Sequence, residues 1–294
     1  MNKFFLKIAR RLFPFLPRGR SVAIRLATTL FGRKFEDVIT LSDGRRFYIN
    51  VISTVNEHLF FLNKYEDYET RLVKKIVKTG DTVFDVGANF GWYTIIASKL
   101  VGSTGKVYAF EMVPDIVSEF QRNIDLNNLG NNIRMEAIAL GERTGTIEYF
   151  YSEDQEMGNL QADILVKGSR MLKKGATSMV KLDDYVAQDV IEKVDFIKCD
   201  IDGAEVLFLR GARKTIETKR PVIILEVNER AQKAQGHSCR EIFEELGCFG
   251  YSFFSLRFNL RQIEANEFGR NFKDNILCLP ADKLHTLAGL PRIS

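Results

Sequence analysis

Between residues 81 and 227, short runs of mostly apolar residues alternate with longer segments in which apolar residues recur every three or four positions. The short runs are typical of buried β-strands, and the longer segments are typical of helices that bury one face. This alternation predicts a mostly parallel sheet that helices cover on both faces. The predicted strands are 81–87, 106–111, 133–140, 146–151, 194–200 and 221–227, and the predicted helices are 92–100, 115–127 and 204–218.

The C-terminal part of the chain departs from this alternation. Residues 251–256 and 275–279 are two apolar runs joined by a loop, which favours an antiparallel pair at one end of the sheet. The predicted fold class is α/β, with a doubly wound, mostly parallel, seven-stranded Rossmann-like sheet and a terminal antiparallel strand pair. The polar segment 152–179 shows no clear pattern, and a loop of this length favours a lid or a binding loop.

The residues before this domain predict a hairpin and a helical leader. Two β-rich runs flank a Ser-Asp-Gly sequence at residues 42–44, which is typical of a tight turn. Residues 66–78 then have helical periodicity. We therefore divide the chain into a basic amphipathic leader (1–34), a β-hairpin extension (35–65) and one α/β domain (66–294).

The leader is strongly basic, although the net charge of the whole chain is only +4. Of the 42 basic residues, nine lie in residues 1–34 together with no acidic residue, which leaves 33 against 38 acidic residues, or −5, in the remainder. A mildly acidic body argues against a protein that coats nucleic acid.

A helix is expected to open the leader and to end before Pro14. It can lie on an anionic membrane surface through residues 1–20, or pack its apolar face on the domain. Arginines interrupt the apolar stretch, which argues against a secretory signal. The apolar residues at helical spacing are Phe5, Ile8, Ala9 and Leu12.

Composition narrows the class further. The chain is 45% hydrophobic and 27% charged, as expected for a globular protein with a buried core. No apolar run is long enough to cross a bilayer. The four cysteines form no C-x-x-C pair, which favours reduced thiols over a zinc finger or a disulfide framework. We expect a cytoplasmic location. The leader can place the protein at the inner face of the membrane as a peripheral protein.

The first turn from strand to helix carries the clearest chemical signal. It contains Asp85, Gly87 and Gly91, and the next predicted strand ends in Glu111. Glycines let a ligand approach backbone N–H groups at a helix N-terminus. A carboxylate at the tip of the next strand can accept hydrogen bonds from both hydroxyls of a ribose. This arrangement predicts a cofactor that contains adenosine.

The spacing of the glycines distinguishes between such cofactors. A nicotinamide dinucleotide site has G-x-G-x-x-G to fit a pyrophosphate, whereas the glycines here are separated by Ala-Asn-Phe, and no P-loop lysine follows. An NAD-linked oxidoreductase is therefore disfavoured. The D-x-G-x-x-x-G turn followed by a strand-ending acid suits S-adenosylmethionine, which has no phosphates.

Six short motifs occur in the same order as in the FkbM-type family of S-adenosylmethionine-dependent methyltransferases. The sequence resembles this family from about residue 66 to residue 280. One departure is Asp202, where the family usually has glutamate, and another is Met112, where proline is common. The matching motifs are V-F-D-V-G-A-N-F-G-W-Y-T (83–94), A-F-E-M-V-P (109–114), A-I-A-L-G (137–141), K-L-D-D-Y (181–185), D-F-I-K-C-D-I-D-G-A-E (195–205) and P-V-I-I-L-E (221–226).

The resemblance implies roles for particular residues and makes residues 66–294 a methyltransferase domain. It implies that Glu111 binds the ribose and that Glu136 and Ala137 lie near the adenine. The residues implied to line the methionine part of the cofactor are Asp85, Gly87, Asn89 and Gly91.

A second set of acids is predicted to lie on the same rim as Glu111, because parallel strands end at one edge of a sheet. Asp200 is the first choice for a general base or for a group that orients the acceptor hydroxyl. Glu205 starts the following helix, where it is either catalytic or complements the helix dipole. Glu226 ends the next strand and can support the acceptor or the cofactor. Lys198 is expected to form a buried ion pair with one of these acids.

Two further sets of side chains are candidates for a role at this rim, the histidines as a base and the acids as metal ligands. Among the three histidines, only His237 is placed to reach it, as an alternative base. Acidic oxygens from Asp200, Asp202, Glu226, Asp274 and Asn275 can bind Mg²⁺, but acids at strand ends are common without metal, so we assign no metal site.

The predicted function is therefore O-methylation of a hydroxyl on a sugar, a glycan or a secondary metabolite, with S-adenosylmethionine as the cofactor and no nucleic-acid partner. The alternative is a catalytically inactive scaffold of the same fold that its basic leader recruits to a membrane. The complete set of cofactor residues argues against this alternative, because a scaffold does not need all of them.

Overall fold

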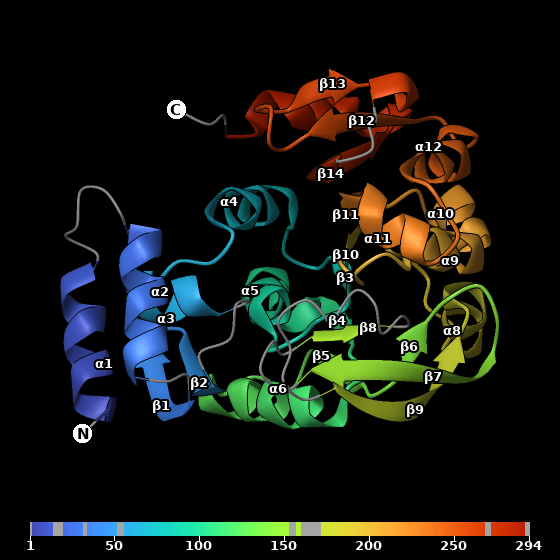
Figure 1. The fold of residues 1–294 in the computed structure, drawn as a ribbon. Coiled ribbons are helices and arrows are strands. Elements are labelled where there is room, and N and C mark those ends of the chain that lie inside the picture. The colour runs from blue at the N-terminus through green and yellow to red at the C-terminus, as the bar shows by residue number, and fades with distance from the viewer. Residues whose placement is uncertain are drawn as a thin grey trace.

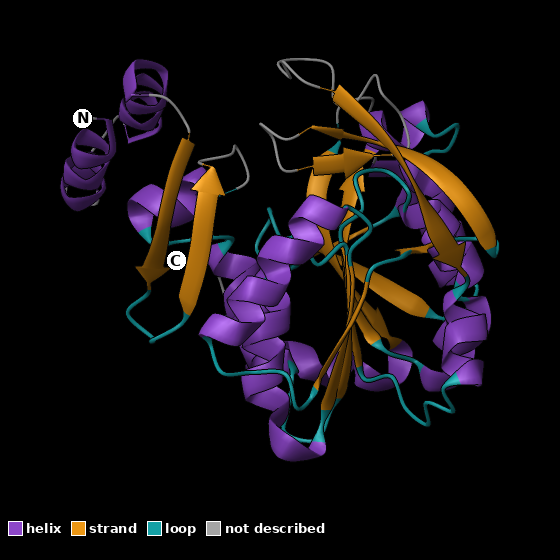
Figure 2. Cartoon of the chain, turned by 90° about the horizontal axis from the view of Figure 1, so that it is seen from below, coloured by secondary structure: helices purple, strands orange, loops and turns teal. Residues whose placement is uncertain are grey.

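The computed structural model describes residues 2–13, 20–31, 34–51, 56–152, 157–159, 172–267 and 272–291. A sheet with helices on both faces forms the centre of the molecule, and a hairpin with the first helices lies at one side (Figures 1 and 2). None of the described helices has both the length and the apolar character needed to span a bilayer.

Eight of the described strands form the central sheet. In chain order they are β3 (Thr82–Val86), β4 (Lys106–Phe110), β5 (Ile133–Glu136), β10 (Phe196–Cys199), β11 (Val222–Asn228), β12 (Tyr251–Ser255), β13 (Arg261–Ile263) and β14 (Lys273–Pro280).

The order of the strands across the sheet is β13-β12-β14-β11-β10-β3-β4-β5. The strands from β11 to β5 are parallel, whereas β14 is antiparallel to both of its neighbours. The mostly parallel sheet and the antiparallel C-terminal strands are thus confirmed. The edge strand β13 was not predicted, because its three residues are too few to form a pattern.

Helices cover both faces of this sheet, as predicted (Figure 2). Side chains alternate between the two faces: Val222 and Ile224 of β11 join one hydrophobic cluster, and Ile223 and Leu225 join the other. The helices are α4 (Asp67–Ile76), α5 (Trp92–Val101), α6 (Pro114–Leu126), α8 (Leu182–Gln188), α9 (Glu205–Gly211), α10 (Arg213–Lys219), α11 (Glu229–Ala234) and α12 (Cys239–Gly247), and the 3₁₀ turns are η2 (Gly102–Thr104), η3 (Ala265–Glu267) and η4 (Ala281–Gly289).

The N-terminal segment forms the predicted hairpin. Strands β1 (Lys34–Thr40) and β2 (Arg46–Val51) pair in antiparallel register around the turn at 42–44. The hairpin is fastened to α6, whose Asn123 side chain accepts a hydrogen bond of 2.7 Å from the backbone N–H of Tyr48. Around it lie α1 (Asn2–Leu12), α2 (Arg20–Phe31) and α3 (Glu57–Leu62) (Figure 1).

Residues 139–180 contribute the strands of a second, smaller sheet, which was not predicted. The predicted strand 133–140 is divided into β5 and β6, and the predicted strand 146–151 belongs to the smaller sheet. Its strands are β6 (Ala139–Leu140), β7 (Gly145–Ser152), β8 (Met157–Asn159) and β9 (Leu172–Val180), in the order β6-β9-β7-β8.

The prediction of a loop over 152–179 was therefore wrong for its last part, where β9 pairs along β7. Strand β9 was missed because most of its side chains are at least partly exposed, so its sequence shows no apolar alternation. Residues 153–156 and 160–171 of the expected loop lie outside the described part of the chain.

Candidate active site

The glycine turn after β3 lies where the strand order reverses, since the chain leaves β3 toward β4 on one side and β10 pairs on the other. Open α/β sheets bind ligands at such a point. Gly87 has φ +78°, and a Cβ atom on it would lie 2.0 Å from the carbonyl oxygen of Asp200. Only glycine therefore allows the ends of β3 and β10 to approach each other this closely.

We expect Gly87→Ala to lower both stability and cofactor binding. Gly44 is a matched control, because its φ is +81° but an added Cβ would have no neighbour within 4 Å. Gly44→Ala should cost about 1–2 kcal/mol from the left-handed backbone alone. Gly87→Ala adds a backbone clash, so thermal unfolding should show a clearly larger loss. Equal melting temperatures for the two variants would contradict this account of the turn.

Glu111 joins the glycine turn to the end of β4. It is 8% exposed, and its two oxygens accept hydrogen bonds of 3.0 Å from the backbone N–H groups of Asn89 and Val113. Burial raises the pKa of the Glu111 carboxyl, although these two hydrogen bonds act in the opposite direction. The carboxylate is thus held in place at the strand tip, where each oxygen keeps a lone pair for a ribose hydroxyl.

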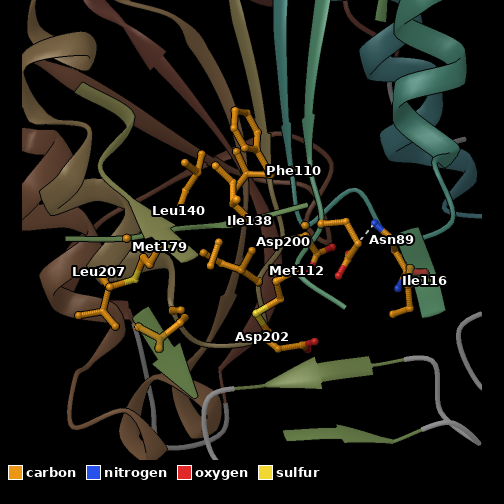
Figure 3. Close-up of a pocket in the computed structure, with 18 residues that line it drawn as sticks. Asn89, Phe110, Met112, Ile116, Ile138, Leu140, Met179, Asp200, Asp202 and Leu207 are labelled. Atoms are coloured by element: carbon orange, nitrogen blue, oxygen red, sulfur yellow. Dashed lines mark hydrogen bonds between the residues drawn. The ribbon is translucent and has the colours of Figure 1, made fainter. Parts of the chain in front are cut away.

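A cleft, which we call the cofactor cleft, opens between Glu111 and the second sheet. Apolar side chains such as Ile138, Leu140 and Met179 lie at one end, and Asn89 lies at the other (Figure 3). An apolar end suits the flat adenine, and a polar end suits the amino-acid part of S-adenosylmethionine. The residues present therefore fit this cofactor.

Four residues that the resemblance implied for the cofactor, Asp85, Gly91, Glu136 and Ala137, do not line the cofactor cleft. Glu136 instead accepts hydrogen bonds from Arg134 (2.7 Å) and Tyr185 (2.9 Å), and Ala137 is exposed between β5 and β6. The next residues along the chain, from 138 to 141, form the wall. At Gly91, an added Cβ would lie 2.3 Å from the ring of Phe120, so this glycine serves helix packing.

A second hollow, which we call the polar pocket, adjoins the cofactor cleft. The two share Gly87, Asn89, Asp200 and Asp202 in their walls. The other residues of the polar pocket come from α3, α4 and the segment between them, from the start of α5, and from β3, β10, β11 and β14: His58, Leu62, Lys64, Tyr65, Glu66, Asp67, Asp85, Ala88, Phe90, Trp92, Tyr93, Lys198, Glu226 and Lys273.

Lys198 and Asp200 form the ion pair that the sequence predicted, with 2.9 Å between Nζ and Oδ2. Lys198 is only 1% exposed. Burial disfavours its ammonium, but the carboxylates of Asp200 and Glu66 outweigh burial and raise the pKa of Lys198. Asp85 lies in the same wall, accepts a hydrogen bond from Thr94, and has its pKa raised to about 6 by burial.

Glu226 reaches the polar pocket from the end of β11. One of its oxygens pairs with Lys273 at 2.9 Å, and within the described part of the chain its other oxygen is buried without a hydrogen bond. Burial, followed by the charge of Asp200, raises the pKa of Glu226. Burial likewise raises the pKa of Asp202, whose backbone has φ +50°. A ligand hydroxyl can satisfy the unpaired oxygen of Glu226.

Glu205 differs from the other predicted acids because it lines neither hollow. It is fully buried and accepts hydrogen bonds of 3.0 Å from the backbone N–H groups of Ile201 and Gly203, and another from the side chain of Gln232. Burial raises its pKa to about 8. Of the two roles considered for Glu205, the geometry favours the structural one, which is to brace the turn that carries Asp200 and Asp202.

Residues 58–67 also contribute to the polar pocket, which no pattern in the sequence predicted. Glu66 has φ +42°, and its carboxylate accepts a hydrogen bond of 2.5 Å from the hydroxyl of Tyr93. Burial raises the pKa of Glu66 to about 7, while Lys198 opposes that shift. No motif marks Glu66, because it lies at the start of a helix rather than at the end of a strand.

The histidines are also placed differently from the prediction. His58 of α3 lines the polar pocket, whereas the Nδ1 atom of His237 lies 3.0 Å from Glu241 on α12. Among the residues that the structure describes, no cluster of three histidine, cysteine or acidic side chains is arranged to hold a metal ion. Asp274, one of the possible oxygen ligands for Mg²⁺, accepts hydrogen bonds from the hydroxyl of Ser255 and from the backbone N–H of Arg257.

The glycine turn, the carboxylate at the tip of the next strand and the adjoining polar pocket have the arrangement expected of a site for S-adenosylmethionine beside a site for a second ligand. The sequence model of the Methyltransferase FkbM domain family matches residues 85–253, which is more than half of the chain. The chain belongs to this family, as the order of its motifs indicated.

The ribosomal protein L11 methyltransferase of Streptococcus pyogenes is 32% identical over 164 residues, which are 55% of this chain and 45% of that protein. The chain thus spans about half the length of the curated relatives it matches. Methyltransferase FkbM from Methylobacillus flagellatus has a TM-score of 0.43 at 15% identity, over 76% of this chain and 52% of that one. An S-adenosylmethionine-dependent O-methyltransferase from Thermotoga maritima has a TM-score of 0.41 at 14% identity, over 86% and 81%.

Proposed function

We propose that this protein methylates a hydroxyl oxygen of a sugar, a glycan or a secondary metabolite that binds in the polar pocket. The supporting observation is that the polar pocket opens directly onto the cofactor cleft and shares four residues with it. Its carboxylates can accept hydrogen bonds from an acceptor that carries several hydroxyl groups. Tyr65 in the same wall offers aromatic surface for the apolar face of such an acceptor.

When bound, S-adenosylmethionine supplies an electrophilic methyl group on a positively charged sulfur. Gly87, Asn89 and Glu111 would hold this cofactor, and it would supply its methyl carbon to the acceptor oxygen, with the electron pair of the carbon–sulfur bond left on sulfur. The hydroxyl proton passes to a carboxylate of the polar pocket. We assign the orientation of the hydroxyl to Asp200, which Lys198 holds in place, and a supporting hydrogen bond to Glu226.

We assign the role of proton acceptor to Glu66. Its carboxylate faces the Tyr93 hydroxyl from α5, Lys198 and Asp200 from β10, and Glu69 from its own helix. A general base works best when its pKa lies near the working pH, and the pKa of Glu66 is raised to about 7.

The pH dependence of methyl transfer tests this assignment. A base must be ionised to accept a proton, so kcat should rise with pH up to about 7 and then level off. Glu66→Gln should lower kcat by about 100-fold or more and remove this limb of the profile. Tyr93→Phe removes a hydrogen bond that favours the carboxylate, so the limb should move to higher pH in that variant. An unchanged profile in Glu66→Gln would exclude Glu66 as the base.

The function itself is tested with cofactor that carries a labelled methyl group. The purified protein is incubated with a small-molecule and glycan extract of cells that lack it, and the extract is then analysed for label. We expect a labelled ether that acid and base do not hydrolyse. Binding of the cofactor without any labelled acceptor would favour the scaffold, and label on nitrogen or carbon would contradict O-methylation.

A further inference from the structure

Exposed apolar side chains are concentrated on the first two helices. Within the described part of the chain, ten large apolar side chains are exposed, and seven of them lie in α1 and α2. Six of the seven form two rows with a spacing of four residues, which places each row on one side of its helix. The rows are Phe4, Ile8 and Leu12 on α1, and Val22, Leu26 and Leu30 on α2.

The opposite sides of the same helices hold them on the protein. Leu6 and Ala9 of α1, and Ile24 and Ala27 of α2, are buried in the main hydrophobic cluster. The sequence had placed Ala9 on the same face as Phe5, Ile8 and Leu12, so the structure separates an inner face from an outer one. The buried inner faces thus hold both helices on the protein, whereas the two exposed rows are not part of the main hydrophobic cluster.

The position of the helices leaves these rows accessible. In Figure 1, α1 and α2 lie side by side at one edge of the molecule, away from β12, β13 and β14. Helix α1 packs on α3, where Arg10 donates a hydrogen bond of 3.0 Å to Asn63 and Phe13 stacks on Phe61 at 5.2 Å. Helix α3 in turn contributes His58 and Leu62 to the polar pocket.

The charge around the rows indicates what covers them. Residues 1–34 carry nine basic side chains and no acidic one, and Arg11 and Arg25 are exposed on the two helices. Two copies of the chain facing each other would bring these basic groups together, which disfavours a dimer through this surface. Apolar rows beside basic side chains are typical of helices that lie in the plane of an anionic membrane.

We propose that α1 and α2 together form a docking surface for anionic lipid, with the two apolar rows among the acyl chains and the basic side chains on the phosphates. The surface extends beyond residues 1–20, because α2 supplies half of the apolar contact. The membrane then lies on the side of α1 away from α3. Docking thus places α1 between the membrane and α3, whose His58 and Leu62 line the polar pocket.

Sedimentation of the full-length protein with vesicles tests this proposal. The protein should pellet with phosphatidylcholine vesicles that contain phosphatidylglycerol and stay in solution with phosphatidylcholine alone. Binding should weaken in about 1 M salt, because the Debye length is then only about 3 Å and the attraction between basic side chains and lipid phosphates is screened. Ile8→Glu combined with Leu26→Glu should abolish pelleting, and Arg11→Glu combined with Arg25→Glu should reduce it at least tenfold.

Val190→Glu is the matched control, because Val190 is 78% exposed but lies outside the two helices. It should pellet like the unmodified protein, and all variants should bind the cofactor equally, which shows that each is folded. The proposal is overturned if the unmodified protein does not pellet with anionic vesicles, or if Ile8→Glu with Leu26→Glu pellets as well as it does. It is also overturned if sizing shows a dimer that the same pair of substitutions dissociates. None of these outcomes bears on the proposed methyl transfer, which is measured separately.

Discussion

Glu111→Ala should weaken binding of S-adenosylmethionine by about 100-fold or more, which corresponds to about 3 kcal/mol. The substitution removes the carboxylate that is positioned for the two ribose hydroxyls, and hydrogen bonds to a charged group contribute about 1.5–3 kcal/mol each. It also leaves the backbone N–H groups of Asn89 and Val113 without their partner, so only the backbone hydrogen bonds from Gly87 and Ala88 to Phe110 still tie the glycine turn to β4. Calorimetric titration with the cofactor measures the effect.

Two variants separate these contributions. Glu111→Gln keeps the shape of the side chain and one acceptor oxygen, so we expect a loss smaller than that of Glu111→Ala. Glu136→Ala removes the acid at the tip of the neighbouring strand, which lies outside the cofactor cleft, and should leave cofactor affinity unchanged. Equal affinity in Glu111→Ala and the unmodified protein would refute the assignment of the ribose to Glu111.

Asp200→Asn should retain the cofactor but lower kcat by about 100-fold or more. The amide has nearly the same shape as the carboxylate, so the end of β10 and its contact with Gly87 are preserved. It has no negative charge for Lys198 and is a weaker acceptor for a substrate hydroxyl. Single-turnover measurements with labelled cofactor separate this loss in the chemical step from slower binding.

Asp195→Asn is the corresponding control, because Asp195 lies just before β10, at the opposite end of the strand from Asp200. The Asp195 carboxylate accepts a hydrogen bond from the backbone N–H of Thr82 and lines neither the cofactor cleft nor the polar pocket. Asp195→Asn should therefore affect stability more than kcat. Full activity in Asp200→Asn would remove Asp200 from the mechanism and leave Glu66 as the carboxylate to examine.

The central sheet was predictable because its strands are buried on both faces. Most residues of β3 and β11 are apolar, and nearly all residues of both strands are buried. The same property located Glu111, Asp200 and Glu226, since a side chain at the end of a parallel strand lies on the binding edge whatever surrounds it.

The parts that were missed depend on contacts between segments that are distant in the sequence. Strand β9 pairs with β7 across a long insertion, and its exposed side chains give no apolar alternation. Glu66 reaches the polar pocket only because α3 and α4 fold over the end of the sheet. Its raised pKa results from burial beside Tyr93 and Lys198, and none of these neighbours is near it in sequence.

Six acidic side chains and three lysines line the polar pocket, which adjoins the cofactor cleft. Burial raises the pKa of four of these acids, and a cationic sulfur beside them would favour their ionised forms. Opposite charges attract more strongly in a partly buried site than in bulk water. Methyl transfer turns the cationic sulfur into a neutral thioether, and the demethylated by-product then no longer gains from this attraction. We therefore expect the demethylated by-product to bind more weakly than the cofactor itself.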